Sequence, residues 1–294
     1  MSRRSINRVA ICGGTHGNEL TGVTLIRKWQ SDPAPLRRSS FEAEPFLSNP
    51  RAVEENRRYV DQDLNRCFLL KDLADDNLSG YEQNRAKVIN RRFGPKGDPA
   101  YDLLIDLHTT TANMGASVII ERDDGLAGRI AAYIREVDPE VRILAYTDAE
   151  DYPYLAEITN SSIEIEVGPV PQGVVRSDIL EKSERLAGQL LDALDAYNRG
   201  ELPEATRPIS VFTFLSNVDY YRRADGTIWS CVHPERQDRD YEILEPGDPL
   251  FLTYDGETIP YEGPEPAWPI FINEAAYYEK RCAMTLCKKE ELTP

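Results

Sequence analysis

The chain has 294 residues, with 34 Lys and Arg against 50 Asp and Glu, which gives a formal net charge of −16. An anionic protein repels phosphate backbones and acidic lipid headgroups, so this balance argues against nucleic-acid binding and against docking on acidic membranes. Hydrophobic residues make up 41% of the chain, which is enough for a folded core and excludes global disorder.

No stretch approaches the ~20 consecutive apolar residues of a membrane-spanning helix. The apolar run near the N-terminus covers only residues 9–12, which is too short for a secretory signal. The five cysteines are scattered and form no Cys-x-x-Cys pair, so neither a disulfide framework nor a cysteine zinc site is predicted. We therefore expect a cytoplasmic protein with no membrane or nucleic-acid partner.

Strand-like and helix-like patterns alternate through the first two thirds of the chain. Apolar or alternating runs predict strands at residues 8–12, 102–107, 117–121, 142–146 and 163–167. Periodic patterns between them predict helices at residues 21–30, 84–93, 126–137 and 179–197. This alternation predicts an α/β fold, in which helices cover both faces of a sheet.

The pattern changes after residue 204. The rest of the chain has short β-type runs separated by Pro and Gly, and no helical periodicity. These runs lie at residues 210–215, 227–232, 250–253 and 268–272. We therefore predict two domains, an α/β domain over residues 1–204 and a smaller β-rich domain over residues 205–294.

Two of the three histidines lie where strands are predicted to end. His16 follows a glycine turn after the first strand, and His108 follows the strand at 102–107. Ligands of α/β proteins collect at the carboxyl ends of strands, so both imidazoles are candidates for one crevice. Glu19 lies three residues after His16, where the first turn of a helix would bring both side chains to one ion. With His108 they would form the three-ligand set of a hydrolytic zinc site, and Asp106 could accept a hydrogen bond from behind it.

The same residues also fit a plainer interpretation. A His-x-x-Glu spacing occurs often by chance on exposed helices, and His108 also fits a core histidine with satisfied hydrogen bonds. The glycines beside His16 lack the spacing of a nucleotide-binding loop. Spacing alone leaves both a metal site and a structural role open.

Two carboxylates alternate with apolar residues in the strand at 163–167. Glu164 and Glu166 therefore leave that strand on one face. A half-exposed strand with a polar side is one interpretation. The other makes Glu166, which is nearer to the strand end, a general base, because burying a carboxylate without a partner is costly. If Glu164 points the same way, the like charge would raise a carboxyl pKa.

Arginines and an amide cluster before residue 68. Arg58, Asn65 and Arg66 lie close in sequence to Asp63. In an acidic chain such arginines are commonly paired surface charges. A guanidinium beside an amide also suits the capture of a substrate carboxylate.

Several segments taken together resemble one protein family. They read GGTHGNELTGV, NPRAV with RRYVDQDLNRCF, DLHTTTANMG, IEVGPVPQG and NEAAYYEK, and they extend from residue 9 to about residue 280. In content and order they resemble the aspartoacylase branch of the aspartoacylase/succinylglutamate desuccinylase family. The resemblance implies a zinc-carboxypeptidase-like α/β domain, a smaller β domain that shapes the substrate channel, and a homo-oligomer.

The resemblance also implies an activity, the hydrolysis of N-acetyl-L-aspartate to aspartate and acetate with one zinc ion per subunit. By motif position, His16, Glu19 and His108 are the implied zinc ligands. Glu166 is the implied general base, which contacts the substrate and later returns the proton as an acid.

The remaining implied roles concern the substrate. Arg58 would bind the scissile carbonyl and polarise it, while Asn65 and Arg66 would hold a substrate carboxylate. Tyr277 would add a carboxylate contact from the C-terminal region, and Arg281 would supply positive charge there.

One segment departs from the family's animal members, which carry an arginine just before the catalytic glutamate for the substrate's side-chain carboxylate. Residues 151–162 contain no arginine, and instead offer Tyr152, Tyr154 and Glu157. Either Arg281 and a tyrosine take that role, or the preferred substrate is another N-acyl amino acid, such as an N-acetyl aromatic amino acid or succinylglutamate. A metal- or carboxylate-binding protein without turnover and a peptidase are further alternatives, which Glu166 and a narrowed channel respectively disfavour.

Overall fold

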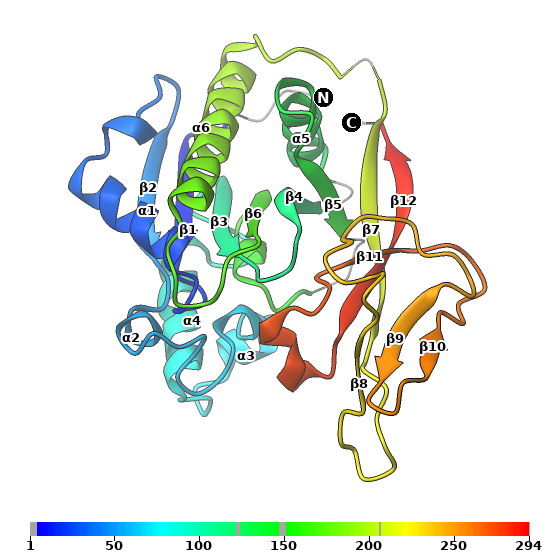
Figure 1. Ribbon diagram of the computed structural model, residues 1–294. Coiled ribbons are helices and arrows are strands. Elements are labelled where there is room, and N and C mark those ends of the chain that lie inside the picture. The colour runs from blue at the N-terminus through cyan, green and yellow to red at the C-terminus, as the bar shows by residue number, and fades with distance from the viewer. Residues whose placement is uncertain (1–4, 122–123, 147–150, 206, 294) are drawn as a thin grey trace.

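Figure 1 shows a computed structural model of the chain, in which helices pack on a central sheet and a smaller sheet lies to one side. The structure describes residues 5–121, 124–146, 151–205 and 207–293. No helix within these ranges has the length and apolar character needed to cross a membrane.

The described residues form a nine-stranded mixed sheet, which confirms the predicted α/β class. Its strands, in spatial order, are β11 (Trp268–Ile270), β12 (Met284–Leu292), β7 (Ile209–Val218), β5 (Arg142–Tyr146), β4 (Gly115–Glu121), β6 (Ser162–Gly168), β3 (Leu103–Thr109), β1 (Arg8–Gly13) and β2 (Glu42–Leu47). The strands from β6 to β2 run parallel, and so do β4, β5 and β7. The pairs β4–β6, β7–β12 and β11–β12 are antiparallel.

Helices cover both faces of this sheet. The helices α1 (Leu20–Ser31), α5 (Gly125–Val137) and α6 (Ser177–Arg199) share one apolar core with the strands, and Figure 1 shows α5 and α6 in front of the sheet. The other core contains α4 (Tyr81–Phe93) and the 3₁₀ turns η2 (Leu64–Arg66) and η3 (Leu155–Ile158). Three short helical segments complete this part, namely η1 (Ala34–Leu36), α2 (Pro50–Glu54) and α3 (Leu70–Ala74).

The alternation of side chains along β3 and β6 decides where polar groups point. In β3, Leu103 and Ile105 belong to the core under α1, α5 and α6, whereas Leu104 belongs to the core under α4. Successive side chains of a strand point to opposite faces, so Asp106 and His108 share the face of Leu104. The same parity in β6 buries Ile163 and Ile165 under α6 and sends Glu164 and Glu166 to the α4 face.

The C-terminal region is rich in β-strands, as predicted, but it does not stand entirely apart. Its long strands β7 and β12 extend the main sheet from β5. A separate antiparallel sheet consists of β8 (Ser230–Val232), β9 (Pro249–Thr253) and β10 (Thr258–Pro260), at the lower right of Figure 1. The 3₁₀ segment η4 (Ala275–Lys280) returns toward the α/β part. A boundary at residue 204 falls between α6 and β7, and it stays a prediction.

Most of the predicted elements have structural counterparts within a few residues of their expected ends. The strands β2 and β12 of the main sheet were not predicted, and neither was β10 of the smaller sheet. β2 contains Glu42, Glu44 and Pro45 and lies at the sheet edge, and β12 ends in a run of charged residues. Neither sequence has the continuous apolar run that marks a buried parallel strand.

A buried carboxylate links two segments of the C-terminal region, the one around Asp240 and the one before η4. Asp240 is 9% exposed, and its Oδ1 accepts a hydrogen bond from the backbone N–H of Ile272 at 3.1 Å. Its Oδ2 has no hydrogen-bond partner among the described residues. Burial raises the pKa of Asp240 to about 7. Because this folded pKa lies above the unfolded value of about 3.9, ionised Asp240 destabilises the fold, and stability is lost as the pH rises between those two values.

Asp240→Asn should remove this part of the pH dependence while keeping an oxygen that accepts from Ile272. At pH 8 the free energy of unfolding of the variant should exceed that of the wild type by up to about 4 kcal/mol, whereas at pH 3 the two should be similar. Urea unfolding at a series of pH values measures both curves. A constant difference from pH 3 to pH 8 would refute the claim.

Candidate metal centre and active site

A tight glycine loop between β1 and α1 positions the first two candidate ligands. Gly14 has a φ of +68°, a conformation that favours glycine. A Cβ on Gly17 would lie 2.2 Å from the backbone carbon of Ala52, so the loop can pack against α2 only without a side chain there. Glu19 directly precedes α1, so His16 and Glu19 lie in the entry turn and not, as predicted, in the first helical turn.

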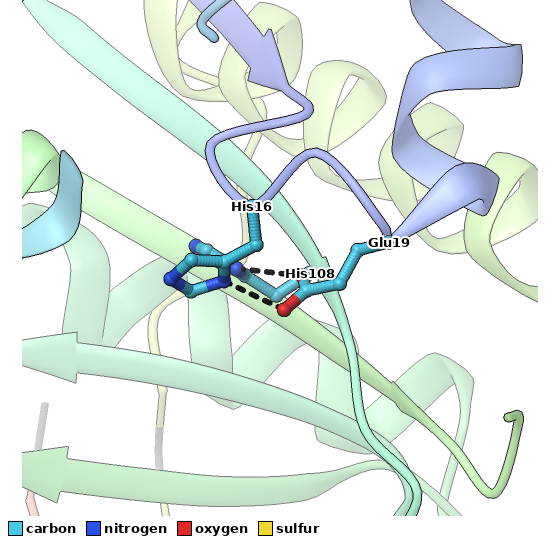
Figure 2. A group of neighbouring side chains, drawn as sticks. All are labelled: His16, Glu19 and His108. Carbon is cyan, nitrogen blue, oxygen red and sulfur yellow. Dashed lines mark hydrogen bonds and ion pairs between the residues drawn. The ribbon is translucent and has the colours of Figure 1, made fainter. Parts of the chain in front are cut away.

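His16, Glu19 and His108 converge as the sequence predicted. His16 Nδ1 lies 2.6 Å from Glu19 Oε1, and His108 Nδ1 lies 3.0 Å from Glu19 Oε2. The candidate ligand atoms all lie within 4.8 Å of one another, and each residue is at most 5% exposed. Figure 2 shows both imidazole rings turned toward the Glu19 carboxylate, His16 from the loop and His108 from β3.

A second carboxylate holds the far nitrogen of each imidazole. His16 Nε2 lies 3.1 Å from Asp63 Oδ1, and His108 Nε2 lies 2.9 Å from Asp106 Oδ2. Asp106 is fully buried and also accepts from Thr15 Oγ1 at 2.8 Å, which confirms its predicted place behind His108. The sequence reasoning noted Asp63 only as a neighbour of arginines and missed its contact with His16.

These contacts fit a bound cation. A neutral imidazole has one N–H, and carboxylates lie at both of its nitrogens here. If Nε2 donates to Asp63 or Asp106, the lone pair of Nδ1 points at an oxygen of Glu19, which is repulsive unless a positive charge lies between them. A divalent ion between His16, Glu19 and His108 removes this conflict, and the donor set of two nitrogens and a carboxylate is one that zinc takes in hydrolases.

Asp63 also organises the cations beside this centre. Its Oδ2 accepts from Arg58 Nη2 at 3.3 Å and from Lys280 Nζ at 2.8 Å. Burial would raise the pKa of Asp63, but His16, Arg58 and Lys280 together hold it well below its usual value. Arg58 also donates to Glu19 at 3.3 Å. Burial acts to lower the pKa of Arg58, but Asp63 and Glu19 outweigh it and raise that pKa.

A cavity of about 390 Å³ opens beside the candidate ligands. Its lining includes seven of the nine residues to which the sequence analysis gave metal, catalytic or substrate roles, which are His16, Arg58, Asn65, Arg66, His108, Glu166 and Tyr277. The lining also includes Glu164 and three tyrosines from β5 and the segment before η3. One metal candidate and one substrate candidate, Glu19 and Arg281, are not in the lining.

Asn65 and Arg66 lie in η2 with donors toward the cavity. Asn65 Oδ1 accepts from the backbone N–H of Leu155 at 2.7 Å, so the amide nitrogen of Asn65 is the group left to donate to a ligand. Arg66 donates to the backbone oxygen of Asn65 at 2.6 Å, and its guanidinium lies 4.9 Å from the ring centroid of Tyr154. Arg66 makes no ion pair with a carboxylate of the described residues.

Glu164 and Glu166 both reach the cavity from β6. Glu166 is the register partner of His108 on β3, and Glu164 is the partner of Asp106. Burial raises the pKa of Glu166 well above its usual value, with a further rise from Glu19. Burial likewise raises the pKa of Glu164 to about 7. The pKa of Tyr277 is raised by burial and by Glu166, so its phenol is a neutral donor.

Arg281 was expected to supply positive charge in the site, and it is not among the residues that line this cavity. Arg281 is exposed, and it ends η4 with a φ of +54°. The pKa of Asp219 is lowered mainly by its hydrogen bond from Arg222, with a smaller contribution from the charge of Arg281. The preceding residue, Lys280, lines the cavity and pairs with Asp63 instead.

Glu274 is a buried residue that the sequence reasoning missed. It is 4% exposed, and its Oε2 accepts from the hydroxyl of Thr110 and from the backbone N–H of Thr111 at 2.7 Å. Its Oε1 accepts from the backbone N–H of Ala276 at 3.0 Å. Glu274 therefore fastens η4, which carries Tyr277, to the segment that follows His108. The quoted NEAAYYEK motif contains it, but only the fold reveals its partners.

A buried cation site beside a carboxylate with a raised pKa, in a cavity at the ends of parallel strands, defines a metal-dependent hydrolase. Comparison with known proteins agrees. The profile described as the succinylglutamate desuccinylase/aspartoacylase catalytic domain matches residues 5–194, and the AstE/AspA barrel-sandwich hybrid domain matches residues 207–289. The chain belongs to the succinylglutamate desuccinylase/aspartoacylase family.

Relatives and a solved structure extend along the whole chain. A probable aspartoacylase of Nostoc is 45% identical and covers 98% of both chains. An N-acyl-aromatic-L-amino acid amidohydrolase of Xenopus laevis is 42% identical over 97% of this chain and 95% of its own. The crystal structure of murine aminoacylase 3 superposes with a TM-score of 0.94 at 38% identity, covering 100% of this chain and 99% of that one.

Asp63→Asn should weaken metal binding without removing a metal ligand. The amide cannot replace the charged acceptor behind His16, so metal affinity should fall about 10–100-fold. Competition with a chromophoric chelator measures that affinity. Unchanged affinity would show that Asp63 does not support the imidazole.

Glu274→Ala should loosen η4. It leaves the Thr111 N–H without its buried acceptor, so the free energy of unfolding should fall by about 3 kcal/mol, and the apparent KM should rise. Thermal unfolding and initial rates measure the two effects. Glu279→Ala, on the exposed side of η4, is the matched control and should change stability little. Equal effects of both variants would contradict the assignment.

Proposed function

We propose that this chain is a zinc-dependent amidohydrolase that cleaves the amide bond of N-acyl-L-amino acids. With N-acetyl-L-aspartate as substrate, the products are acetate and L-aspartate. The observation that carries the proposal is the grouping of three kinds of function in one cavity: the His16–Glu19–His108 cation site, the carboxylate of Glu166, and the free donors of Asn65 and Arg66.

His16, Glu19 and His108 would hold the zinc ion. A zinc ion there supplies a Lewis acid, which makes water a competent nucleophile near neutral pH. Asp63 and Asp106 keep the two imidazoles in the orientation that presents Nδ1 to the ion.

Glu166 would act as the general base and then as the general acid. It accepts a proton from water as the water oxygen attacks the acyl carbon, and it gives that proton to the amide nitrogen as the carbon–nitrogen bond breaks. The balance is one water consumed, with one carboxylate and one amine released. The raised pKa of Glu166 suits both steps, because it makes the carboxylate a stronger base and the carboxylic acid available as a donor.

Arg58 would stabilise the negative charge that develops on the acyl oxygen. Two of its nitrogens are held by Glu19 and Asp63, which fixes the guanidinium, while Nε has no acceptor among the described residues. A fixed donor in a water-poor site stabilises a transition-state charge without reorganising. Tyr277, also in the cavity lining, offers a second neutral donor.

Asn65 and Arg66 would bind the α-carboxylate. Arg66 has no carboxylate partner within the described part of the chain, and the amide of Asn65 is fixed with its nitrogen available. A guanidinium paired with an amide donor fits a planar carboxylate and fixes the amide bond relative to Glu166.

Two substrate groups are candidates. The name of the Nostoc relative indicates N-acetyl-L-aspartate, and the name of the Xenopus laevis relative indicates N-acyl aromatic amino acids. The second is supported by Tyr146, Tyr152 and Tyr154, three aromatic side chains that line the cavity. Zinc analysis coupled to product release from both substrates separates the candidates. No hydrolysis of either by the zinc-loaded protein would contradict the proposal.

Glu166→Gln should keep the shape of the site and remove the base. The turnover number should fall about 10²-fold or more, because the amide cannot accept the proton. Zinc content should stay at the wild-type level, since Glu166 is not among the proposed ligands. His16→Ala is the comparison, since it should lose zinc and activity together. Near-normal turnover of Glu166→Gln would overturn the role of Glu166.

A further inference from the structure

One part of the cavity is lined by residues that have no role in the proposed reaction. The rings of Tyr146, Tyr152 and Tyr154 pack together, with the centroids of Tyr152 and Tyr154 5.5 Å apart and those of Tyr146 and Tyr152 5.0 Å apart. Ile119 of β4 and Glu164 of β6 are register partners, and both line the cavity beside these rings. We call these five residues the tyrosine recess.

Glu164 is the one unassigned carboxylate among the lining residues. It is half-buried, and no group of the described residues donates a hydrogen bond to it or forms an ion pair with it. The nearby Glu157 differs, because it accepts from the Tyr146 hydroxyl and is not in the lining. Glu164 is two residues before Glu166 on the same face of β6, so it lies one step further from the cation site.

The cations of the cavity leave none for a second substrate carboxylate. Arg58 and Lys280 are both paired with Asp63. Arg66 is the remaining cation in the lining, and the proposed function assigns it to the α-carboxylate. An acidic side chain that entered the tyrosine recess would meet Glu164 and phenol rings, while Arg66, which borders the recess at Tyr154, is already assigned to the α-carboxylate.

We propose that Glu164 determines side-chain specificity: it favours an N-acyl amino acid whose side chain donates a hydrogen bond from nitrogen, as an ammonium or an amide does, and disfavours one that ends in a carboxylate. This inference rests on the proposed amidohydrolase function. Tyrosine faces add to the selection, because their negative electrostatic potential attracts cations. Arg66 on the ring of Tyr154 already has this geometry.

Three substrates of equal chain length test the charge preference of the zinc-loaded enzyme at about pH 8.5, where Glu164, whose pKa burial raises to about 7, is ionised. They are N-acetyl-L-aspartate, Nα-acetyl-L-asparagine and Nα-acetyl-L-2,4-diaminobutyrate, whose side chains carry charges of −1, 0 and +1. For the wild type, kcat/KM should rise in that order, with about tenfold or more between the first and the last, because close charges interact strongly in a partly buried site. Comparing kcat/KM for the asparagine and diaminobutyrate substrates separates the effect of hydrogen bonding from the effect of charge.

Glu164→Gln should compress this range to within about threefold, since it keeps the shape and removes the charge. Glu157→Gln is the matched control, because that acid is near the recess but outside the lining, and the range should persist. A wild-type preference for N-acetyl-L-aspartate, or an unchanged range in Glu164→Gln, would overturn the inference and leave the amidohydrolase function intact. Failure of the zinc-loaded wild type to hydrolyse any of the three would overturn both.

Discussion

The structure depends on one shared carboxylate. The Glu19 carboxylate contacts the Nδ1 atoms of two imidazoles, His16 in a loop and His108 in a strand. These two histidines are 92 positions apart in the sequence. Their other nitrogens rest on Asp63 and Asp106, so each ring has a carboxylate on either side. Positive charge at the rings makes that arrangement favourable, and a divalent ion bound by both Nδ1 atoms and Glu19 would supply it while leaving the imidazoles neutral. The arginine and lysine contacts of Asp63 extend the same balance of charge into the cavity.

Two features of the fold bring the residues of this centre together: the alternation of side chains along β3 and β6, and the hydrogen bonds of Glu274. The α4 face of β3 and β6 carries Asp106, His108, Glu164 and Glu166, while the opposite face of the same strands is apolar and packs under α6. The polar groups of the active site therefore do not interrupt the apolar packing of the main core, because they lie on the other side of the sheet. Glu274 then brings η4 from the C-terminal region onto the segment after His108, so residues from both ends of the chain surround one cavity.

Much of this could be predicted from the sequence, for identifiable reasons. Strand and helix periodicity placed most elements, and alternation in SIEIEVG placed both glutamates on one face. Asp106 could be predicted because it shares a strand face with His108. Asp63 and Glu274 could not, since their partners are distant in sequence and only tertiary packing joins them. The place of Lys280, which lines the cavity and pairs with Asp63, was not predicted, because the sequence reasoning considered only its neighbour Arg281. The pairing of β7 with β5 could not be predicted, because the local sequence of a strand does not identify the strand that it pairs with.

The most direct measurement of the central claim is anomalous diffraction at the zinc absorption edge from crystals of the zinc-loaded protein. The account predicts one peak per chain, bonded to the Nδ1 atoms of His16 and His108 and to the Glu19 carboxylate, with zinc–nitrogen distances of about 2.0–2.1 Å. A catalytically active crystal with no anomalous peak between these three residues, or with its zinc bound elsewhere, would contradict the account.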